Sequence, residues 1–379
     1  MADGGYKSEM TVMTMNSTST LGTLADLARA QVETGSLTQP SEEWRYTDLS
    51  IWGDRSASSE FPIQWTATES VTVKRASETA DNFGEQFGWA VTELTDNPGA
   101  VTTLALANDA LVITGHGRVY LAVAATVPTH IPVVVRVAEG QRMEVSLVST
   151  GSVTGHTCIS VHLAPNAECV INEVKTHSAP LVSSTYLVIQ ESKSHFQWVG
   201  VDGLTGVGIR TIRVRQTGDE AKTFLTALNL GAKKSQNYIH THVEHLLPGG
   251  ESRQLVKSVL TDQSVSEFKG LVYVAPGAQK TDSSQSNQNM ILSEQARALS
   301  RPQLSIFADD VKCAHGATMS QLDADQIYYL QTRGVNPAEA KAVLMTGFAD
   351  EVAGQFTMDS VTAIARETVR HFFESISQS

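Results

Sequence analysis

Residues 309–318 read Asp-Asp-Val-Lys-Cys-Ala-His-Gly-Ala-Thr and separate two kinds of sequence pattern. Short runs rich in β-branched residues precede this stretch, and Asp323 with Gln326 after it is typical of a helix start. Cys313 and His315 are two positions apart, so an extended backbone places both side chains on one face of a sheet. A thiolate and an imidazole on one face can bind the same metal ion or cluster, which makes this stretch a candidate metal site.

The spacing of Cys313 and His315 also has a plain structural explanation. A buried cysteine usually behaves as a small apolar residue, and a histidine beside a glycine is often satisfied by a backbone carbonyl. Two ligands do not complete a tetrahedral site. Spacing alone therefore favours structural roles for both residues, and the metal site needs support from elsewhere in the chain.

The composition excludes some classes of partner. The chain has 379 residues, with 40 acidic and 28 basic side chains and a formal net charge of −12. This charge repels phosphate backbones and anionic surfaces, so we expect neither nucleic acid nor a membrane as a partner. No apolar run is long enough to span a bilayer, and the first residues lack the features of a secretory signal. Because the chain has only three cysteines, Cys158, Cys169 and Cys313, we expect a reducing, cytoplasmic location and no disulfide framework.

The middle of the chain predicts strands and no long amphipathic helix, which indicates an all-β core. A sandwich, a double jelly roll and a parallel β-solenoid all fit this pattern. The sequence shows no strict repeat period, which weighs against the solenoid. The clearest predicted strands are residues 71–73, 111–113, 119–123, 131–137, 143–148, 211–215 and 271–274.

Helical signals lie on both sides of the β core. Residues 21–35 carry apolar side chains near one helical face. Asn336, Pro337 and Glu339 form a helix start with an N-cap and a proline at the first position. Apolar residues between 361 and 376 recur at helical spacing, and this stripe packs either on its own chain or on a partner. We therefore expect four parts: a mobile N-terminal lead (1–20), an N-terminal helical region (21–65), a β core (66–320) and a C-terminal helical domain (321–379).

A histidine cluster supports the competing hypothesis of a metalloenzyme. On a strand, His240, His242 and Glu244 share one face, as the ligands of a cupin metal site do. A cupin also has a glutamate four or five residues after the second histidine, and this chain lacks one there. A β-helix protein that acts on carbohydrate is a third and weaker hypothesis, because it needs paired carboxylates that the sequence does not place. Neither a phosphate-binding Gly-rich loop with lysine nor a Gly-x-Ser-x-Gly nucleophile motif occurs.

Several stretches resemble the SufD family, whose members are scaffold subunits of the Suf iron–sulfur cluster assembly complex. Residues 312–318, Lys-Cys-Ala-His-Gly-Ala-Thr, are similar to the family signature, as are the flanking residues 309–311 and 321–323. Residues 42–47, Glu-Glu-Trp-Arg-Tyr-Thr, resemble a segment near the N-terminus of SufD and its relatives. Residues 277–293, which begin Gly-Ala-Gln-Lys-Thr-Asp, resemble a run shared by SufB and SufD.

The form Lys-Cys-x-His-Gly-Ala-Thr points to SufD rather than to its paralogue SufB. The chain is also expected to lack the longer, cysteine-bearing N-terminal region typical of SufB. Ala314 stands where serine is common in SufD relatives, and this departure leaves Cys313 and His315 in place. Residues 241–245, with Thr, Val and His in alternation, echo a further SufB and SufD segment to which we assign no role.

The resemblance implies a fold and a set of partners. It implies a right-handed parallel β-helix between α-helical N-terminal and C-terminal regions, and a non-catalytic scaffold rather than an enzyme. SufB is the implied partner through the β cores, with a homodimer as the alternative for the isolated chain. The SufC ATPase is implied to bind the C-terminal helices, in contact with Tyr328, Arg333, Gly334 and Pro337.

The same resemblance gives the candidate metal site its chemistry. It implies no tightly bound cofactor, and iron or an iron–sulfur cluster held transiently at the subunit interface. His315 is the implied iron ligand, and Cys313 is a second candidate beside thiolates supplied mainly by SufB. Nucleotide-driven closure of SufC is implied to strain the paired cores and expose this site.

Overall fold

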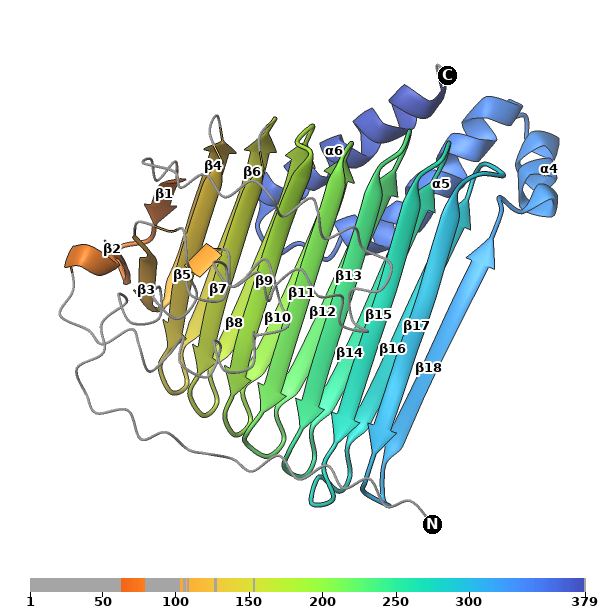
Figure 1. The fold of residues 1–379 in the computed structure, drawn as a ribbon. Coiled ribbons are helices and arrows are strands. Elements are labelled where there is room, and N and C mark those ends of the chain that lie inside the picture. The colour runs from red at the N-terminus through yellow and green to blue at the C-terminus, as the bar shows by residue number, and fades with distance from the viewer. Residues whose placement is uncertain are drawn as a thin grey trace, which may run out of the picture.

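The computed structural model describes residues 63–78, 103–104, 107, 109–125, 128–152 and 154–377. They form two nine-stranded sheets that face each other, with helices along the outside of one sheet (Figure 1). The first sheet contains, in order, β1 (Ile63–Ala67), β4 (Gly117–Ala125), β6 (Arg142–Gly151), β8 (Glu168–His177), β10 (His195–Leu204), β12 (Lys222–Gly231), β14 (Glu251–Leu260), β16 (Asp282–Ile291) and β18 (Lys312–Ser320). The second contains β2 (Val71–Arg75), β3 (Leu111–Gly115), β5 (Thr129–Val137), β7 (Gly155–Leu163), β9 (Leu181–Gln190), β11 (Val207–Gln216), β13 (Gln236–His245), β15 (Val265–Val274) and β17 (Arg297–Ile306).

The chain winds as a parallel β-helix. From β3 onward consecutive strands alternate between the two sheets, and each strand pairs in parallel with the strand two positions further along. Only the first strands differ: β1 pairs antiparallel with β4, and β2 antiparallel with β3. A one-turn 3-10 helix, η4 (Ala76–Glu78), follows β2. The β-helix implied by the family resemblance is therefore confirmed.

The length of one turn changes along the β-helix. Arg142 is in register with Glu168, 26 residues further on, whereas Glu251 is in register with Asp282, 31 residues further on. Because the turn length drifts by several residues, the sequence carries no fixed period even though the backbone repeats. The argument from periodicity against a solenoid was therefore wrong for this chain.

Side chains that point between the two sheets form a continuous interior. In a parallel, in-register sheet, residues that pair across strands stack in files along the axis. Near the N-terminal end these files are aliphatic, and near the C-terminal end they become polar. The aliphatic part includes Val119, Leu121, Val133, Val135, Val145, Leu147, Ile159 and Val161. The polar part includes Ser252, Gln254, Ser258, Ser283, Gln285, Asn287 and Asn289, all buried.

A fully buried ionic cluster lies between these two parts. Arg210 donates to both carboxylate oxygens of Asp202 at 2.7 Å and to Glu173 Oε2 at 2.9 Å, and it stacks over the ring of Trp198. Lys175 Nζ lies 3.4 Å from Glu173 Oε1. Burial alone would raise the pKa of Glu173, but Arg210 and Lys175 hold it below its usual value. The two acids and two bases therefore neutralise one another inside the fold.

The C-terminal helices cover the outer face of the first sheet. They are α4 (Ala324–Thr332), α5 (Pro337–Ala353) and α6 (Asp359–Ser377), and Asp323 and Asn336 cap the first two as predicted. The predicted apolar stripe of α6 is buried, so it packs on its own chain. The outward-facing sheet residues in that cluster include Val174, Val199, Val201, Leu228, Leu230 and Val259.

Polar contacts also attach the helices to the sheet. Lys257 is buried on the outer face of β14, where its Nζ donates to the Phe348 carbonyl at 3.1 Å and pairs with Glu351. Thr357 Oγ1, between α5 and α6, donates to Glu144 Oε1 at 2.6 Å. Among the described helices, none is long and apolar enough to cross a membrane.

Most of the expected N-terminal organisation falls outside the described residues. This applies to the lead (1–20), to residues 21–62 of the expected helical region and to residues 42–47 of the family resemblance. The last three residues of the expected helical region, 63–65, belong to strand β1 and are not helical. The strands of the β core continue to Ser320, and the C-terminal helices begin at Ala324.

The buried ionic cluster gives a prediction about stability. Replacing Arg210 by Leu leaves Glu173 and Asp202 without their shared cation, and we expect this to lower the free energy of unfolding by about 3–5 kcal/mol. Arg253→Leu is the matched control, because its side chain is 36% exposed and pairs with Glu251 and Asp282 at the surface. We expect it to cost less than about 1 kcal/mol in the same denaturant titration. Equal losses in the two variants would contradict the proposed importance of the buried cluster.

Candidate functional site

Among the residues that the structure describes, the C-terminal end of the β-helix has two strand edges without a paired neighbour. β18 is the last strand of the first sheet and pairs on one side with β16, and β17 is the last strand of the second sheet and pairs on one side with β15 (Figure 1). β18 is largely exposed, and β17 alternates between exposed and half-buried residues with none buried. Apolar side chains are exposed at this end, namely Leu299, Ile306, Phe307 and Met319. An unpaired edge with apolar side chains is a surface to which another chain can add strands.

Cys313 and His315 lie on β18, at this open end. Cys313 is in register with Ser283 and His315 with Gln285, and both of these β16 residues are buried in the interior. Cys313 and His315 therefore continue two interior files and share one face, as their spacing predicted. Cys313 is half-buried, whereas His315 is exposed. The end of the β-helix leaves the imidazole accessible from outside the chain.

The Cys313 thiol stands at the end of a buried polar chain. Ser283, its neighbour in register, has its Oγ 2.7 Å from Ser252 Oγ, and Ser252 Oγ lies 2.9 Å from His245 Nε2. On its other side Cys313 packs against an apolar cluster that includes Val272. The thiol thus lies between the serine hydroxyl groups on one side and the apolar side chains around Val272 on the other.

Gln285 of β16 is the register neighbour of His315. Its side chain is 2% exposed, and neither amide atom has a hydrogen-bond partner. A Cβ on Gly270 would come within 2.5 Å of Gln285 Nε2, so the amide extends across the interior to β15. Sequence reasoning did not select Gln285, although it lies in the 277–293 run that resembles SufB and SufD. Its role depends on the register with His315, which the sequence does not give.

The three thiols differ in reactivity. Cys158 and Cys169 are fully buried, and burial raises the pKa of the Cys158 thiol to about 12 and that of Cys169 further. Burial also raises the pKa of Cys313, and the Asp282 carboxylate raises it in the same direction. This thiol is only partly enclosed, however. All three cysteines are free. Cys313 is therefore the one placed to meet a metal ion, whose binding would displace its proton.

The alternative metal site at His240, His242 and Glu244 does not assemble. The three residues do share the outer face of β13, but two of them, His240 and Glu244, are already engaged. His240 Nε2 lies 3.5 Å from Glu267 Oε1, and Arg215 Nε donates to Glu244 Oε2 at 3.0 Å. Burial, with nearby arginines, lowers the pKa of His242 to about 4. Within the described part of the chain, no three His, Cys, Asp or Glu residues are grouped to hold a metal ion.

Residues 241–245, which echo a SufB and SufD segment, have their alternate side chains inside the β-helix. Thr241 Oγ1 donates to Gln254 Oε1 at 2.6 Å, Val243 belongs to the apolar interior, and His245 bonds to Ser252. These three side chains contribute to the interior packing.

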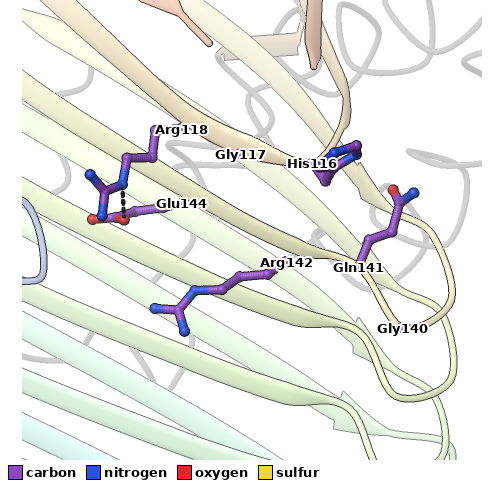
Figure 2. Close-up of a pocket in the computed structure, with 7 residues that line it drawn as sticks. All are labelled: His116, Gly117, Arg118, Gly140, Gln141, Arg142 and Glu144. Carbon is purple, nitrogen blue, oxygen red and sulfur yellow. Dashed lines mark hydrogen bonds and ion pairs between the residues drawn. The ribbon is translucent and has the colours of Figure 1, made fainter. Parts of the chain in front are cut away.

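A hollow lies at the end of the β-helix opposite to β17 and β18, near β4 and β6 (Figure 2). It has a volume of about 480 Å³. Figure 2 shows Arg118 bonded to Glu144 beside Arg142, with His116 at the edge. Arg118 Nε is 3.1 Å from Glu144 Oε2, and Arg142 pairs with Glu168 at 3.1 Å. Each arginine charge is thus balanced within the chain, and we assign no ligand to this hollow.

The residues implied to contact SufC lie on or near α4. Tyr328 is 67% exposed, and no residue of α4 is buried. The Arg333 guanidinium stacks on the ring of Tyr329, 5.3 Å from its centroid. Gly334 has a φ of +88° and ends the helix, and Pro337 is the first residue of α5. The four predicted residues are therefore all exposed, on α4 and around the turn between α4 and α5.

The fold defines the chain as a β-solenoid protein with polar files at its C-terminal end. Residues 121–348 match the family described as SUF system FeS cluster assembly, SufBD core domain. The chain belongs to this family, and membership supports a role in iron–sulfur cluster assembly.

Similar proteins carry names of the same system. The chain is 31% identical over 210 residues to an iron–sulfur cluster assembly SufBD family protein of Synechocystis, covering 55% of this chain and 46% of that protein. It is 37% identical over 135 residues to the SufD protein of Escherichia coli, covering 36% and 32%. It is 30% identical over 144 residues to the SufD protein of Bacillus subtilis, covering 38% and 30%. The matched segments span less than half the length of each relative.

The buried polar chain gives a prediction about pH. His245 is fully buried, and burial lowers its pKa to about 4, while an unfolded histidine has a pKa near 6.5. Between these pH values the unfolded chain binds the extra proton, so stability falls as pH is lowered from about 6.5 to about 4. We expect His245 to contribute up to about 3 kcal/mol to this fall.

Denaturant titrations at several pH values measure this contribution. His245→Gln should make the dependence of unfolding free energy on pH shallower, while His242 still contributes. His371→Gln is the control for the substitution itself, because that side chain is exposed on α6 and lies outside the buried polar chain. A slope that His245→Gln does not alter would refute the assignment.

Proposed function

We propose that this chain is a non-catalytic scaffold subunit for iron–sulfur cluster assembly and that it takes the SufD position in a Suf complex. Family membership supports the system, and the signature around Cys313 and His315 supports the SufD position. The observation that carries the proposal is the placement of these two residues on one face of an edge strand, at the open end of the β-helix. A thiol and an imidazole at an edge are available to a neighbouring chain.

The partner at this edge is SufB, or a second copy when the chain is isolated. The free edges of β17 and β18 offer backbone donors and acceptors, and the exposed Ile306, Phe307 and Met319 offer apolar area. Strand addition together with apolar burial is a common mode of association between sheets. The net charge of −12 and the Suf relatives agree with a cytoplasmic protein partner rather than a nucleic acid or membrane partner.

The site is incomplete without that partner, which suits transient binding of cargo. Tetrahedral iron or cluster sites need more donors than the two that β18 provides. The remaining thiolates come from the partner, so iron or a nascent cluster is held only at the assembled interface. His315 supplies a neutral imidazole, and Cys313 is a second donor. Gln285, in register with His315, has a buried amide without a hydrogen-bond partner.

SufC, the ATPase, binds at the turn between α4 and α5. The exposed Tyr328 and the stacked Arg333 form the kind of aromatic and cationic surface that dominates protein interfaces. α5 and α6 are packed on the sheet, which leaves α4 as the described helix without buried residues. Chemical energy for assembly is supplied by that subunit and not by this chain.

Replacing His315 by Ala tests the site. In a complex co-expressed with SufB and SufC, we expect iron and acid-labile sulfide per complex to fall by about tenfold or more, because a ligand is lost while the fold is not. His116→Ala is the control, an exposed histidine at the opposite end of the β-helix. Undiminished cluster content in a complex of normal mass would remove the role of His315.

Two substitutions test the partner surfaces separately. Lys312 N donates to Thr281 O on the β16 side, so by alternation the N–H of Ala317 points to the free edge. Ala317→Pro therefore removes no bond within the sheet but blocks strand addition, and it should abolish co-purification of SufB while retaining SufC. Tyr328→Ala should abolish co-purification of SufC while retaining SufB.

The two variants are controls for each other, with mass measurement of the eluted complexes as the readout. Retention of both partners by both variants would contradict the assigned surfaces. The position of the cluster site would remain testable through His315.

A further inference from the structure

The inward side chains of β16 are polar and buried, and they differ in how they are bonded. They are Ser283, Gln285, Asn287 and Asn289. Ser283 Oγ lies 2.7 Å from Ser252 Oγ on the neighbouring strand. Asn287 Nδ2 donates to a backbone carbonyl of β14 at 3.1 Å, and Asn289 Nδ2 donates to Asn287 Oδ1 at 2.8 Å. Gln285 is the exception, because neither its Oε1 nor its Nε2 has a partner among the residues that the structure describes.

The unbonded atoms follow one file of the interior. Gln254 of β14 is in register with Gln285, and Gln285 is in register with His315. Gln254 Oε1 accepts a hydrogen bond from Thr241 Oγ1 at 2.6 Å, but Gln254 Nε2 has no partner. β14 and β16 lie wholly within the described residues, and no other buried side-chain nitrogen or oxygen of these two strands lacks a partner. The unmet hydrogen-bonding capacity is therefore confined to the file that ends at His315.

Gly270 makes room for the Gln285 amide. A Cβ at Gly270 would lie 2.5 Å from Gln285 Nε2 and 2.5 Å from the Phe268 ring, so a side chain there would displace the amide. Towards the open end, the next residue in register after Gln285 is His315, and the next after Gly270 is Pro302. Pro302 has an apolar side chain and no N–H group. Because no hydrogen bond holds the Gln285 amide, turning it towards this last turn breaks none.

A buried amide without a partner is costly for the isolated chain. Burial removes its hydrogen bonds to water, and an apolar side chain of the same shape would avoid that loss. Such a group in a folded protein is explained by an ordered water molecule or by a ligand. The position of Gln285 favours a ligand, since strands in a sheet are about 4.8 Å apart and the next strand carries Cys313 and His315.

The Thr241 hydroxyl sets the direction of the file. Because it donates to Gln254 Oε1, the atom that Gln254 has left to offer is its Nε2 donor. A bond from Gln254 Nε2 to Gln285 Oε1 would leave Gln285 Nε2 as the outermost atom of the file. The group presented to the last turn is thus an N–H donor, which binds an anionic acceptor and not a metal cation.

We propose that the Gln285 amide donates a hydrogen bond to the inorganic sulfide of a nascent cluster held at Cys313 and His315. This inference rests on the proposed function and adds a binding residue to it. Sulfide is an anionic acceptor, and hydrogen bonds to the sulfur atoms tune iron–sulfur clusters. A neutral amide supplies such a bond without adding a positive charge that would repel iron.

Gln285→Met tests the assignment, because methionine keeps the length and shape of the side chain and lacks the amide. In the complex co-expressed with SufB and SufC, we expect acid-labile sulfide per complex to fall by about tenfold. Iron bound by the same complex without sulfide should stay unchanged, because the amide donates to sulfur and not to His315. An equal fall of bound iron would show that Gln285 acts on His315 and would overturn the inference.

The isolated chain gives an independent readout. Without sulfide the Gln285 amide has no bond to lose, so Gln285→Met should unfold at the same temperature as the unsubstituted chain or about 2–4 °C higher. Asn287→Leu is the matched control on the same strand, because that amide is bonded within the chain and its loss should lower the unfolding temperature. An equal lowering by the two variants would show that Gln285 is a structural residue bonded through ordered water.

Two further outcomes separate this inference from the proposed function. Normal acid-labile sulfide in the Gln285→Met complex overturns this inference alone. A complex that contains no cluster even with the unsubstituted chain overturns the proposed function and this inference with it.

Discussion

In-register stacking of parallel strands is the constraint on which the rest of this structure depends. Each inward residue must be compatible with the residue one turn before it and one turn after it. Aliphatic files satisfy this by dispersion and burial, as between β4 and β8. The Arg210 cluster satisfies it by charge neutralisation, and the file of Ser252 and Ser283 satisfies it by hydrogen bonding. The file that contains Cys313 ends where no further turn follows.

Hydrophobic pattern predicts some of these strands and not others, and the reason is physical. Residues 131–137 and 143–148 are rich in valine and face an aliphatic interior, so their identity as strands is visible in the sequence. β16 reads Asp-Ser-Ser-Gln-Ser-Asn-Gln-Asn-Met-Ile, and its inward residues are polar. Period-two hydrophobicity is absent there because hydrogen bonds replace apolar contacts. Only family resemblance identified the β-helix.

The candidate site was predictable in part. A spacing of two residues correctly placed Cys313 and His315 on one face, because a strand alternates whatever its surroundings. The same rule placed His240, His242 and Glu244 on one face, but it could not show that Arg215 and Glu267 already engage two of them. Which strands end the sheets, and which residue lies beneath His315, follow from register across turns of changing length. Local sequence does not contain that information.

The connection between β18 and α4 has a mechanical consequence. Three residues, 321–323, join the outermost strand to a helix that buries none of its side chains. Among the described strands, β18 pairs with one neighbour, whereas the strands within the sheet pair with two. The linker and the strand that carries Cys313 and His315 are one continuous segment of backbone, so a displacement of α4 acts directly on that strand.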